Sequence, residues 1–285
     1  VGLQLVNMVL LVHMVAAGGF WRMDTLVAWL LVGSNSGYSA IVVAHELIHR
    51  PEWHRHQLGR LLLCTTLYEH FSTEHIRGHH ARVGTPADPA TARFEETALA
   101  FLLRTVPAQF RSAWRLESKR LGDEHLRWSD TRILRHRVLH GLVVEWAIVL
   151  GVLAYAGVGA AAIYVVQALA AIRLLEAVNY FEHYGLVRTG RKVRPIDSWD
   201  TDSRFTLYTL VGLSRHADHH AYASRPYQQL RYFEESPQLP YGYFGTVVLL
   251  IFRNARFRTL MADELRRRRL GPFVEMGPET GTAAA

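Results

Sequence analysis

Long uncharged apolar stretches occupy two parts of the chain. Residues 1–20 and 25–44 contain no charged side chain, and within 141–172 the only charged residue is Glu145. A helix rises about 1.5 Å per residue, so roughly 20 such residues cover the hydrocarbon core of a bilayer. The pattern predicts two membrane spans in the first 50 residues and a hairpin of two more after the first polar segment.

We therefore predict an all-α integral membrane protein, a transmembrane helix bundle with a helical cytoplasmic cap that holds its chemistry. Residues 1–270 are expected to form a single membrane-embedded domain, and the tail 271–285, rich in Gly, Pro and small residues, is expected to be disordered. The spans are expected at about 1–20, 24–50, 139–157 and 161–184, and the cytoplasmic segments at 51–138 and 185–270.

Basic residues support this topology. Of the 32 Lys and Arg, 15 lie in 50–140 and 15 in 181–270. Cytoplasmic segments of membrane proteins are enriched in Lys and Arg, so both polar segments are expected on the cytoplasmic side. The net charge of +7 does not indicate a nucleic-acid partner, because Arg spread over a membrane cap does not form a recognisable binding module.

Nine of the 16 histidines occur in four clusters, "HELIH", "EHIRGHH", "EHYG" and "RHADHH". Residues at i and i+3 or i+4 share one helical face with Cβ atoms about 5–6 Å apart, so two imidazoles there can hold one metal. His79 and His80 are adjacent and point about 100° apart, so one helix can serve two metals. The nine are His45, His49, His75, His79, His80, His183, His216, His219 and His220.

The first cluster alone matches the H-E-x-x-H motif of zinc peptidases, in which Glu46 would be the general base. A catalytic zinc takes three protein ligands and leaves one position open, so nine histidines are too many for one ion and suit two. Imidazole ligands alone do not distinguish iron, copper, nickel and zinc. Since Cys64 is the only cysteine, a four-thiolate iron site is excluded.

The order of the spans brings the clusters together. The second and fourth spans end at His49 and His183 on the cytoplasmic face, where the two polar segments carry the remaining clusters. Four acidic residues adjoin these histidines in sequence and are candidates to accept hydrogen bonds from imidazole N–H groups. The alternative is that they are surface carboxylates that balance Arg. They are Glu46, Glu74, Glu182 and Asp218.

Taken with their neighbours, these motifs carry a family resemblance. The chain resembles the integral-membrane alkane 1-monooxygenases, a branch of the histidine-box di-iron family that also includes fatty-acid desaturases and xylene monooxygenases. "NYFEHYGL" (179–186) looks like the HYG motif of that branch, and "TPADPATARFEE", "YQQLR" and "SPQLPYGY" support it. Ile48, Arg50 and Ser214 stand where the family usually has Gly, Lys and Gln, but no ligand is lost.

The resemblance implies that the nine histidines bind two irons, and that the protein uses O2 and two electrons to convert medium-chain n-alkanes to 1-alkanols. Glu46, Glu182 and Asp218 are expected to support the site or deliver protons. The implied electron donor is rubredoxin, reduced by an NAD(P)H-dependent rubredoxin reductase, and the implied location is a bacterial inner membrane. Members normally have six membrane helices, so two more are expected before Val1.

Other functions remain open at this point. A xylene-type hydroxylase or a fatty-acid desaturase would use the same di-iron chemistry on a different substrate. An intramembrane zinc protease would bind about one zinc per chain and would need no third histidine cluster. A metal transporter would have histidines along a path through the membrane, whereas here they gather at one face.

Overall fold

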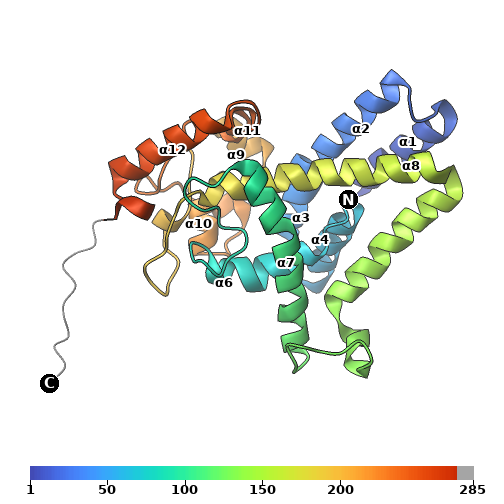
Figure 1. The fold of residues 1–285 in the computed structure, drawn as a ribbon, viewed down its shortest axis with the longest axis horizontal. Helices are drawn as coiled ribbons and strands as arrows, with labels where there is room; N and C mark the ends of the chain where they lie inside the picture. Colours follow the sequence, from blue (N-terminus) through green and yellow to red (C-terminus); the bar gives the residue numbers. More distant parts are fainter. Residues whose placement is uncertain (275–285) are drawn as a thin grey trace.

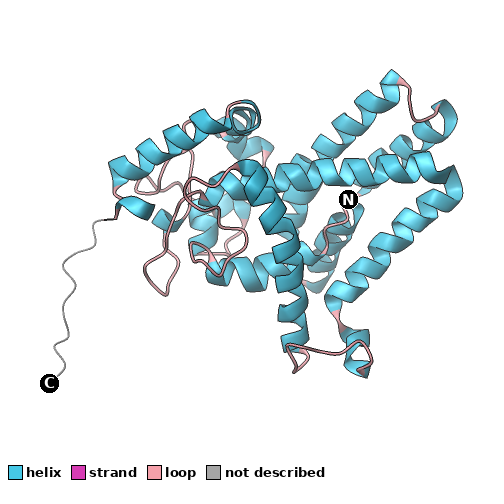
Figure 2. Cartoon of the chain, in the orientation of Figure 1, coloured by secondary structure: helices cyan, strands magenta, loops and turns pink. Residues whose placement is uncertain are grey.

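The computed structural model describes residues 1–274, and Figure 1 shows that helices form its framework. Within that range the only β pairing is a single bridge between Asp200 and Gln238, and Figure 2 accordingly shows helices and loops. The predicted all-helical class is confirmed. The helices are α1 Gly2–Gly18, α2 Met23–Asn35, α3 Val42–Ile48, α4 Trp53–Thr65, α5 His70–Glu74, α6 His80–Arg82, α7 Ala98–Arg120, α8 Arg137–His183, α9 Arg204–Thr209, α10 His216–Ala221, α11 Tyr243–Phe252 and α12 Asn254–Arg268.

The apolar helices occupy the ranges that the sequence predicts for membrane spans. By length and composition, Met23–Ile48 and α8 can each cross a membrane, and α1 is a shorter apolar helix. The first of these stretches is α2 continued through a π-helical turn, Ser36–Ile41, into α3. Within α8, Gly157 has φ 79° and ψ −179°, a conformation that is essentially restricted to glycine, and it divides α8 into two helices. The number of membrane crossings stays a prediction.

Close packing joins the apolar helices into one bundle. In Figure 1, α1, α2 and both halves of α8 extend to one side of the molecule, and α6 and α9–α12 lie on the other. We call α5–α7 and α9–α12 the cap. Gly33 of α2 faces Ala170 of α8, and a Cβ atom added to Gly33 would lie 2.9 Å from the Cβ of Ala170. The absence of a side chain at Gly33 therefore lets α2 and α8 approach closely. The Ser36 hydroxyl accepts a hydrogen bond from Gln4 at 2.8 Å and donates one to Gln167 at 3.2 Å.

An aromatic core fixes the end of α8 where the "NYFEHYGL" stretch meets the cap. Tyr180, Phe181 and Tyr184 are fully buried with Trp199 and Phe257 of the later cap segments. The Trp199 indole donates a hydrogen bond to the Tyr184 carbonyl at 3.0 Å. Because aromatic side chains bury large areas with specific geometry, this core determines where the last turn of α8 points its histidine.

The predicted disordered tail lies mostly outside the described residues. Gly271–Phe273 form a short 3₁₀ turn, and Phe273 contacts Phe94 edge to face with ring centroids 5.5 Å apart. The prediction for 275–285 is not addressed by the described part of the chain.

Candidate metal centre

Eight of the nine clustered histidines form two groups of four. In each group, one ligand nitrogen from every ring lies within 4.8 Å of the other three. A metal–imidazole bond of about 2.0–2.1 Å is compatible with such spacing around a single ion. We define site A as His45, His49, His75 and His219, and site B as His79, His183, His216 and His220.

The ninth histidine, His80, lies beside site A. Its Nε2 is 3.1 Å from Nε2 of His75 and 3.1 Å from Nε2 of His219. Its ring also stacks on that of His220 in site B, with centroids 4.4 Å apart. His80 therefore lies between the two groups, with Nε2 directed at site A.

The histidines of the second cluster, residues 75–80, do not pair in the way that α-helical spacing predicts. His75 and His79, at i and i+4, lie in different sites, whereas His75 and His80, at i and i+5, have their Nε2 atoms together. The reason is that His75–His79 is a π-helical turn. A π turn closes hydrogen bonds from i to i+5, and such turns occur frequently at functional sites.

The short helix α10 also serves both sites. His216 and His220, at i and i+4, belong to site B, and His219 between them belongs to site A. The first cluster follows the expected spacing, since His45 and His49 both lie in site A. The last turn of α8 supplies His183 to site B, so four segments distant in sequence build the centre.

Burial favours the neutral form of three of these imidazoles, which is the form that binds metals. Burial lowers the pKa of His75, His219 and His220 well below its usual value, and neighbouring imidazoles lower it further. Several buried ring nitrogens also have no hydrogen-bond partner among the described residues, including Nε2 of His79 and both nitrogens of His220. Buried polar atoms without partners are rare in folded proteins, so these residues fit metal ions that would supply the missing bonds.

A carboxylate that the sequence did not single out contacts a site B histidine. Asp88 Oδ2 lies 2.9 Å from His79 Nδ1 and accepts a hydrogen bond from the Thr91 hydroxyl at 2.6 Å. Burial alone would raise the pKa of Asp88, but His79 and Thr91 more than offset this and lower it overall. Asp88 lies nine residues after His79, too far for helical spacing to indicate it. The only available signal was its place in "TPADPATARFEE".

Among the four acidic candidates from the sequence, Glu182 is the one that lies against an imidazole. Its Oε1 is 3.2 Å from Nδ1 of His216, a close contact without hydrogen-bond alignment. The Tyr243 hydroxyl donates a hydrogen bond to the same oxygen at 2.6 Å. Glu182 is therefore positioned between α11 and site B.

The other three candidates pair with arginines instead. Within residues 1–274, none of them has a carboxylate oxygen in contact with an imidazole nitrogen. Guanidinium groups match carboxylates in shape and charge, which makes them the stronger partners. The pairs are Glu46 with Arg50, Glu74 with Arg82, and Asp218 with Arg225.

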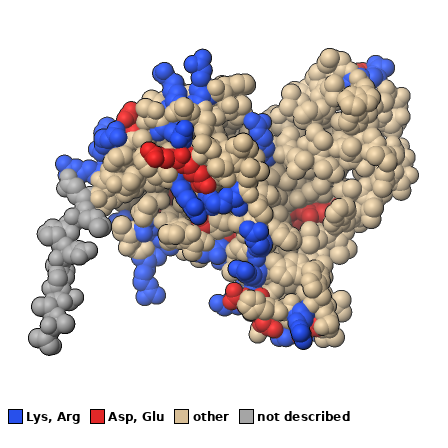
Figure 3. Space-filling view, in the orientation of Figure 1, with Lys and Arg blue, Asp and Glu red and all other residues tan. Residues whose placement is uncertain are grey.

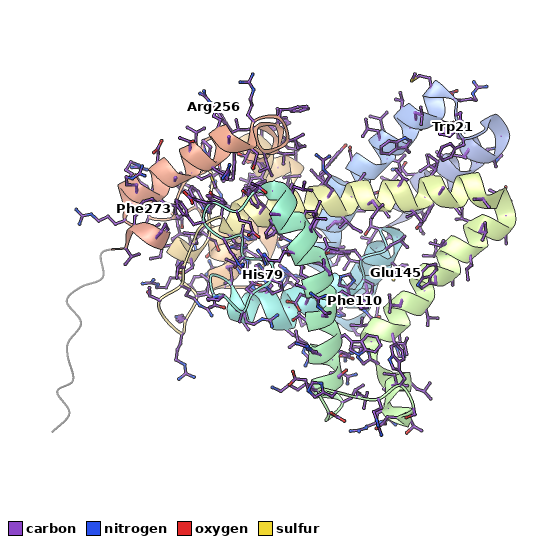
Figure 4. The ribbon with its side chains drawn as sticks, in the orientation of Figure 1. Trp21, His79, Phe110, Glu145, Arg256 and Phe273 are labelled. Carbon is purple, nitrogen blue, oxygen red and sulfur yellow. The ribbon has the colours of Figure 1, made fainter. Side chains whose placement is uncertain are left out.

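Glu145, the isolated charge of the third predicted span, is not part of the centre. Its Oε1 accepts a hydrogen bond from the Glu69 backbone N–H at 2.7 Å. Figure 4 shows His79 among the cap helices and Glu145 on the separate first half of α8. Glu145 thus satisfies a backbone group inside the bundle.

An apolar cavity of about 330 Å³ borders both sites. It lies between the π turn after α2, the second half of α8, and α11. Its walls are mainly aliphatic and aromatic, and histidines of both sites are among its polar lining residues. Apolar lining residues include Ile41, Val42, Phe71, Leu175, Val178 and Val247, and the bordering histidines are His45 and His75 of site A and His216 of site B.

Comparisons with known proteins agree with this arrangement. The fatty acid desaturase family model matches residues 20–248. The chain is 39% identical to alkane 1-monooxygenase 1 of Pseudomonas aeruginosa over 93% of this chain and 71% of that protein. It is also 39% identical to alkane 1-monooxygenase 2 of the same organism, over 81% of this chain and 63% of that protein.

Other relatives give the same result with lower coverage. The chain is 38% identical to an alkane 1-monooxygenase of Acinetobacter baylyi, over 77% of this chain and 54% of that protein, so it spans only about half of that relative. Identity to the hydroxylase component of a xylene/toluene monooxygenase of Pseudomonas putida is 24%. The chain belongs to the alkane 1-monooxygenases, a group within the fatty acid desaturase family.

Proposed function

We propose that this protein hydroxylates the terminal carbon of medium-chain n-alkanes at a histidine-ligated di-iron centre: RCH3 + O2 + 2e− + 2H+ → RCH2OH + H2O. The observation that carries the proposal is the apolar cavity, which histidines of both sites border. The family to which the chain belongs supports the same activity.

In this proposal the cavity and the histidines have separate tasks. Two irons held by sites A and B would supply the oxidising chemistry, because an alkane C–H bond has no polarity for acid–base groups to exploit. The cavity can hold the alkane through van der Waals contact with its aliphatic and aromatic side chains. Since histidines of both sites border the cavity, a chain that enters it can present a terminal carbon to them. Tyr243 and Glu182 also line the cavity, and the Tyr243 hydroxyl holds the Glu182 carboxylate by a hydrogen bond.

We further propose that the centre faces the cytoplasm. Figure 3 shows Lys and Arg over the cap, whereas the surface over α1, α2 and α8 carries almost no charge. This separation supports membrane association through the apolar helices. It also supports placing the basic cap on the cytoplasmic side of a bacterial inner membrane, where a soluble electron donor can reach it.

A basic groove on the cap supports rubredoxin as that donor. The groove has a volume of about 510 Å³ and lies between α7 and the segment before it, and Asp88 is among its lining residues. Because Asp88 contacts His79, the groove gives a short route from the surface to site B. Four of its cations have no carboxylate within 4.0 Å in residues 1–274 and are available to an acidic protein; they are Arg93, Arg111, Arg115 and Lys119.

Reversing two charges in this groove is expected to weaken the reaction with rubredoxin specifically. In the variant Arg111→Glu/Arg115→Glu, we expect KM for rubredoxin to rise about 10-fold or more with a smaller change in kcat, because charge complementarity acts mainly on association. The control is Arg191→Glu/Lys192→Glu, which makes the same change in net charge at exposed positions outside the groove. An equal rise of KM in both variants would argue against this docking site.

One experiment tests the proposed reaction and its orientation together. Membrane vesicles that contain the protein are supplied with rubredoxin, its reductase, NADH, O2 and a series of n-alkanes, and products are identified by position. We expect 1-alkanols, two irons per active chain, and turnover in inside-out but not in right-side-out vesicles. Internal alcohols or alkenes as main products, or one zinc per chain, would overturn the assignment.

Narrowing the cavity is expected to shift the preferred chain length. Val247 is half-buried and lines the cavity on α11. In Val247→Phe we expect longer alkanes to lose turnover more than shorter ones, with the 1-alcohol still the main product. Competition between two alkanes of different length measures the shift. Val143→Phe makes the same substitution at an exposed position of α8 outside the cavity, and it should leave the preference unchanged.

A further inference from the structure

Sites A and B differ in the charged groups that surround their histidines. In site B, His79 lies 2.9 Å from Asp88 and His216 lies 3.2 Å from Glu182. In the part of the chain that the structure describes, no imidazole of site A has a carboxylate oxygen within 4.0 Å. The carboxylate partners thus belong to one site only.

The carboxylates beside site B matter more because site B is the more deeply buried of the two sites. All four site B histidines are buried, whereas two of the four in site A are partly exposed. Asp88 and Glu182 are themselves only 3% and 1% exposed. Moving a cation into a buried environment is unfavourable unless opposite charge is buried with it, and salt screens such buried pairs weakly. The negative charges of Asp88 and Glu182 therefore offset the cost of burying a dication in site B. No carboxylate of the described residues lies within 4.0 Å of a site A imidazole to do the same there.

We infer that Asp88 is a positioning residue that makes the two metal sites unequal, so that site B binds its metal more tightly than site A. Asp88 accepts a hydrogen bond from His79 Nδ1–H, which directs Nε2 toward the metal position and raises its basicity. Removing such a partner typically lowers metal affinity about 10–100-fold. Site A then holds the more exchangeable metal, and two of its histidines border the cavity. The inference rests on the proposed function only in requiring that both sites bind metal.

The position of His80 would favour tighter metal binding at site A, so it provides a competing expectation that the test can decide. Its Nε2 adds a fifth imidazole beside site A. A fifth neutral ligand adds a donor atom but no negative charge, so it does not offset the cost of burying a dication. If donor number dominated over charge, site A would be the tighter site.

The test is a metal titration of the full chain in detergent, stripped of metal and titrated with Co2+ while absorption and heat are recorded. Wild type is expected to bind two equivalents in two steps separated by about 10-fold or more. In Asp88→Asn, which keeps the shape of the side chain, the tight step is expected to weaken about 10–100-fold while the weak step stays unchanged. The control Asp130→Asn makes the same substitution at a carboxylate that pairs with Arg132 and belongs to neither site, and it should change neither step.

If Asp88→Asn folds poorly, replacing one histidine of each site shows which site binds its metal more tightly. His45→Ala disables site A and should leave one equivalent bound with the tight constant. His79→Ala disables site B and should leave one equivalent bound with the weak constant. Equal constants in wild type, a single equivalent in wild type, an unchanged tight step in Asp88→Asn, or the reverse assignment of constants would each overturn the inference. Because no alkane or O2 is present, failure of the proposed hydroxylation would leave these results unaffected.

Discussion

Replacing His183 with alanine is expected to abolish alkane hydroxylation and to lower bound iron from two per chain to about one. His183 is fully buried at the end of α8, and its Nε2 lies 3.0 Å from Nε2 of His216 within site B. A carboxylate partner of a metal-binding histidine is worth roughly 10–100-fold in affinity or activity, so loss of a ligand should exceed that range. Iron analysis of the purified variant, together with its turnover of an alkane, measures both effects.

His125→Ala is the matched control for that result. His125 is exposed in the loop after α7 and belongs to neither site. It should retain both irons and wild-type turnover. If His183→Ala also kept two irons and its activity, the assignment of site B would be wrong, because no other part of α8 contributes a histidine to the centre.

Replacing Arg225 with methionine is expected to destabilise the protein by about 3–5 kcal/mol, the usual cost of leaving one partner of a buried ion pair without the other. Asp218 is fully buried in α10 between site A and site B histidines. Its carboxylate is held by the Arg225 guanidinium and accepts a hydrogen bond from the Arg231 backbone N–H at 2.8 Å. The expected fall in thermal midpoint, measured in detergent, is on the order of 10 °C.

Arg231→Met provides the control, because Arg231 is exposed and supports Asp218 only through its backbone. Its thermal midpoint should stay close to that of wild type. Adding Asp218→Asn to Arg225→Met removes the unpaired charge and should recover much of the lost stability. Equal midpoints for Arg225→Met and Arg231→Met would show that the pair does not hold α10 in place.

The apolar helices and the histidine motifs were predictable because they depend on local sequence. Uncharged runs of about 20 residues identify apolar helices directly, and the helices Gly2–Gly18 and Met23–Ile48 lie in the predicted ranges. The fold class follows from the same pattern. The nine histidines stand out because clustered imidazoles at helical spacing are uncommon without a metal. Eight of them converge in two groups, although metal binding itself stays a proposal.

Assignment of histidines to the two sites was not predictable from spacing. Helical arithmetic pairs His75 with His79, but the π turn moves them into different groups and brings His80 toward His75 instead. A π turn depends on tertiary packing, since its hydrogen bonding is rarely favoured by local sequence alone. Adjacency in sequence was also a poor guide to the carboxylates that contact imidazoles, because Glu46, Glu74 and Asp218 pair with arginines four to eight residues further along the chain.

By itself, the sequence determined that this protein is an all-helical chain with long apolar helices, nine clustered histidines and the motifs of its family. Only the tertiary structure decided that Asp88 supports His79, that α10 divides its histidines between two sites, and that one cavity borders both. The physical reason is the distance along the chain over which each effect acts. Hydrophobic runs and helical spacing act over a few residues, whereas the partner of a buried charge is whichever group the folded chain brings within hydrogen-bonding distance.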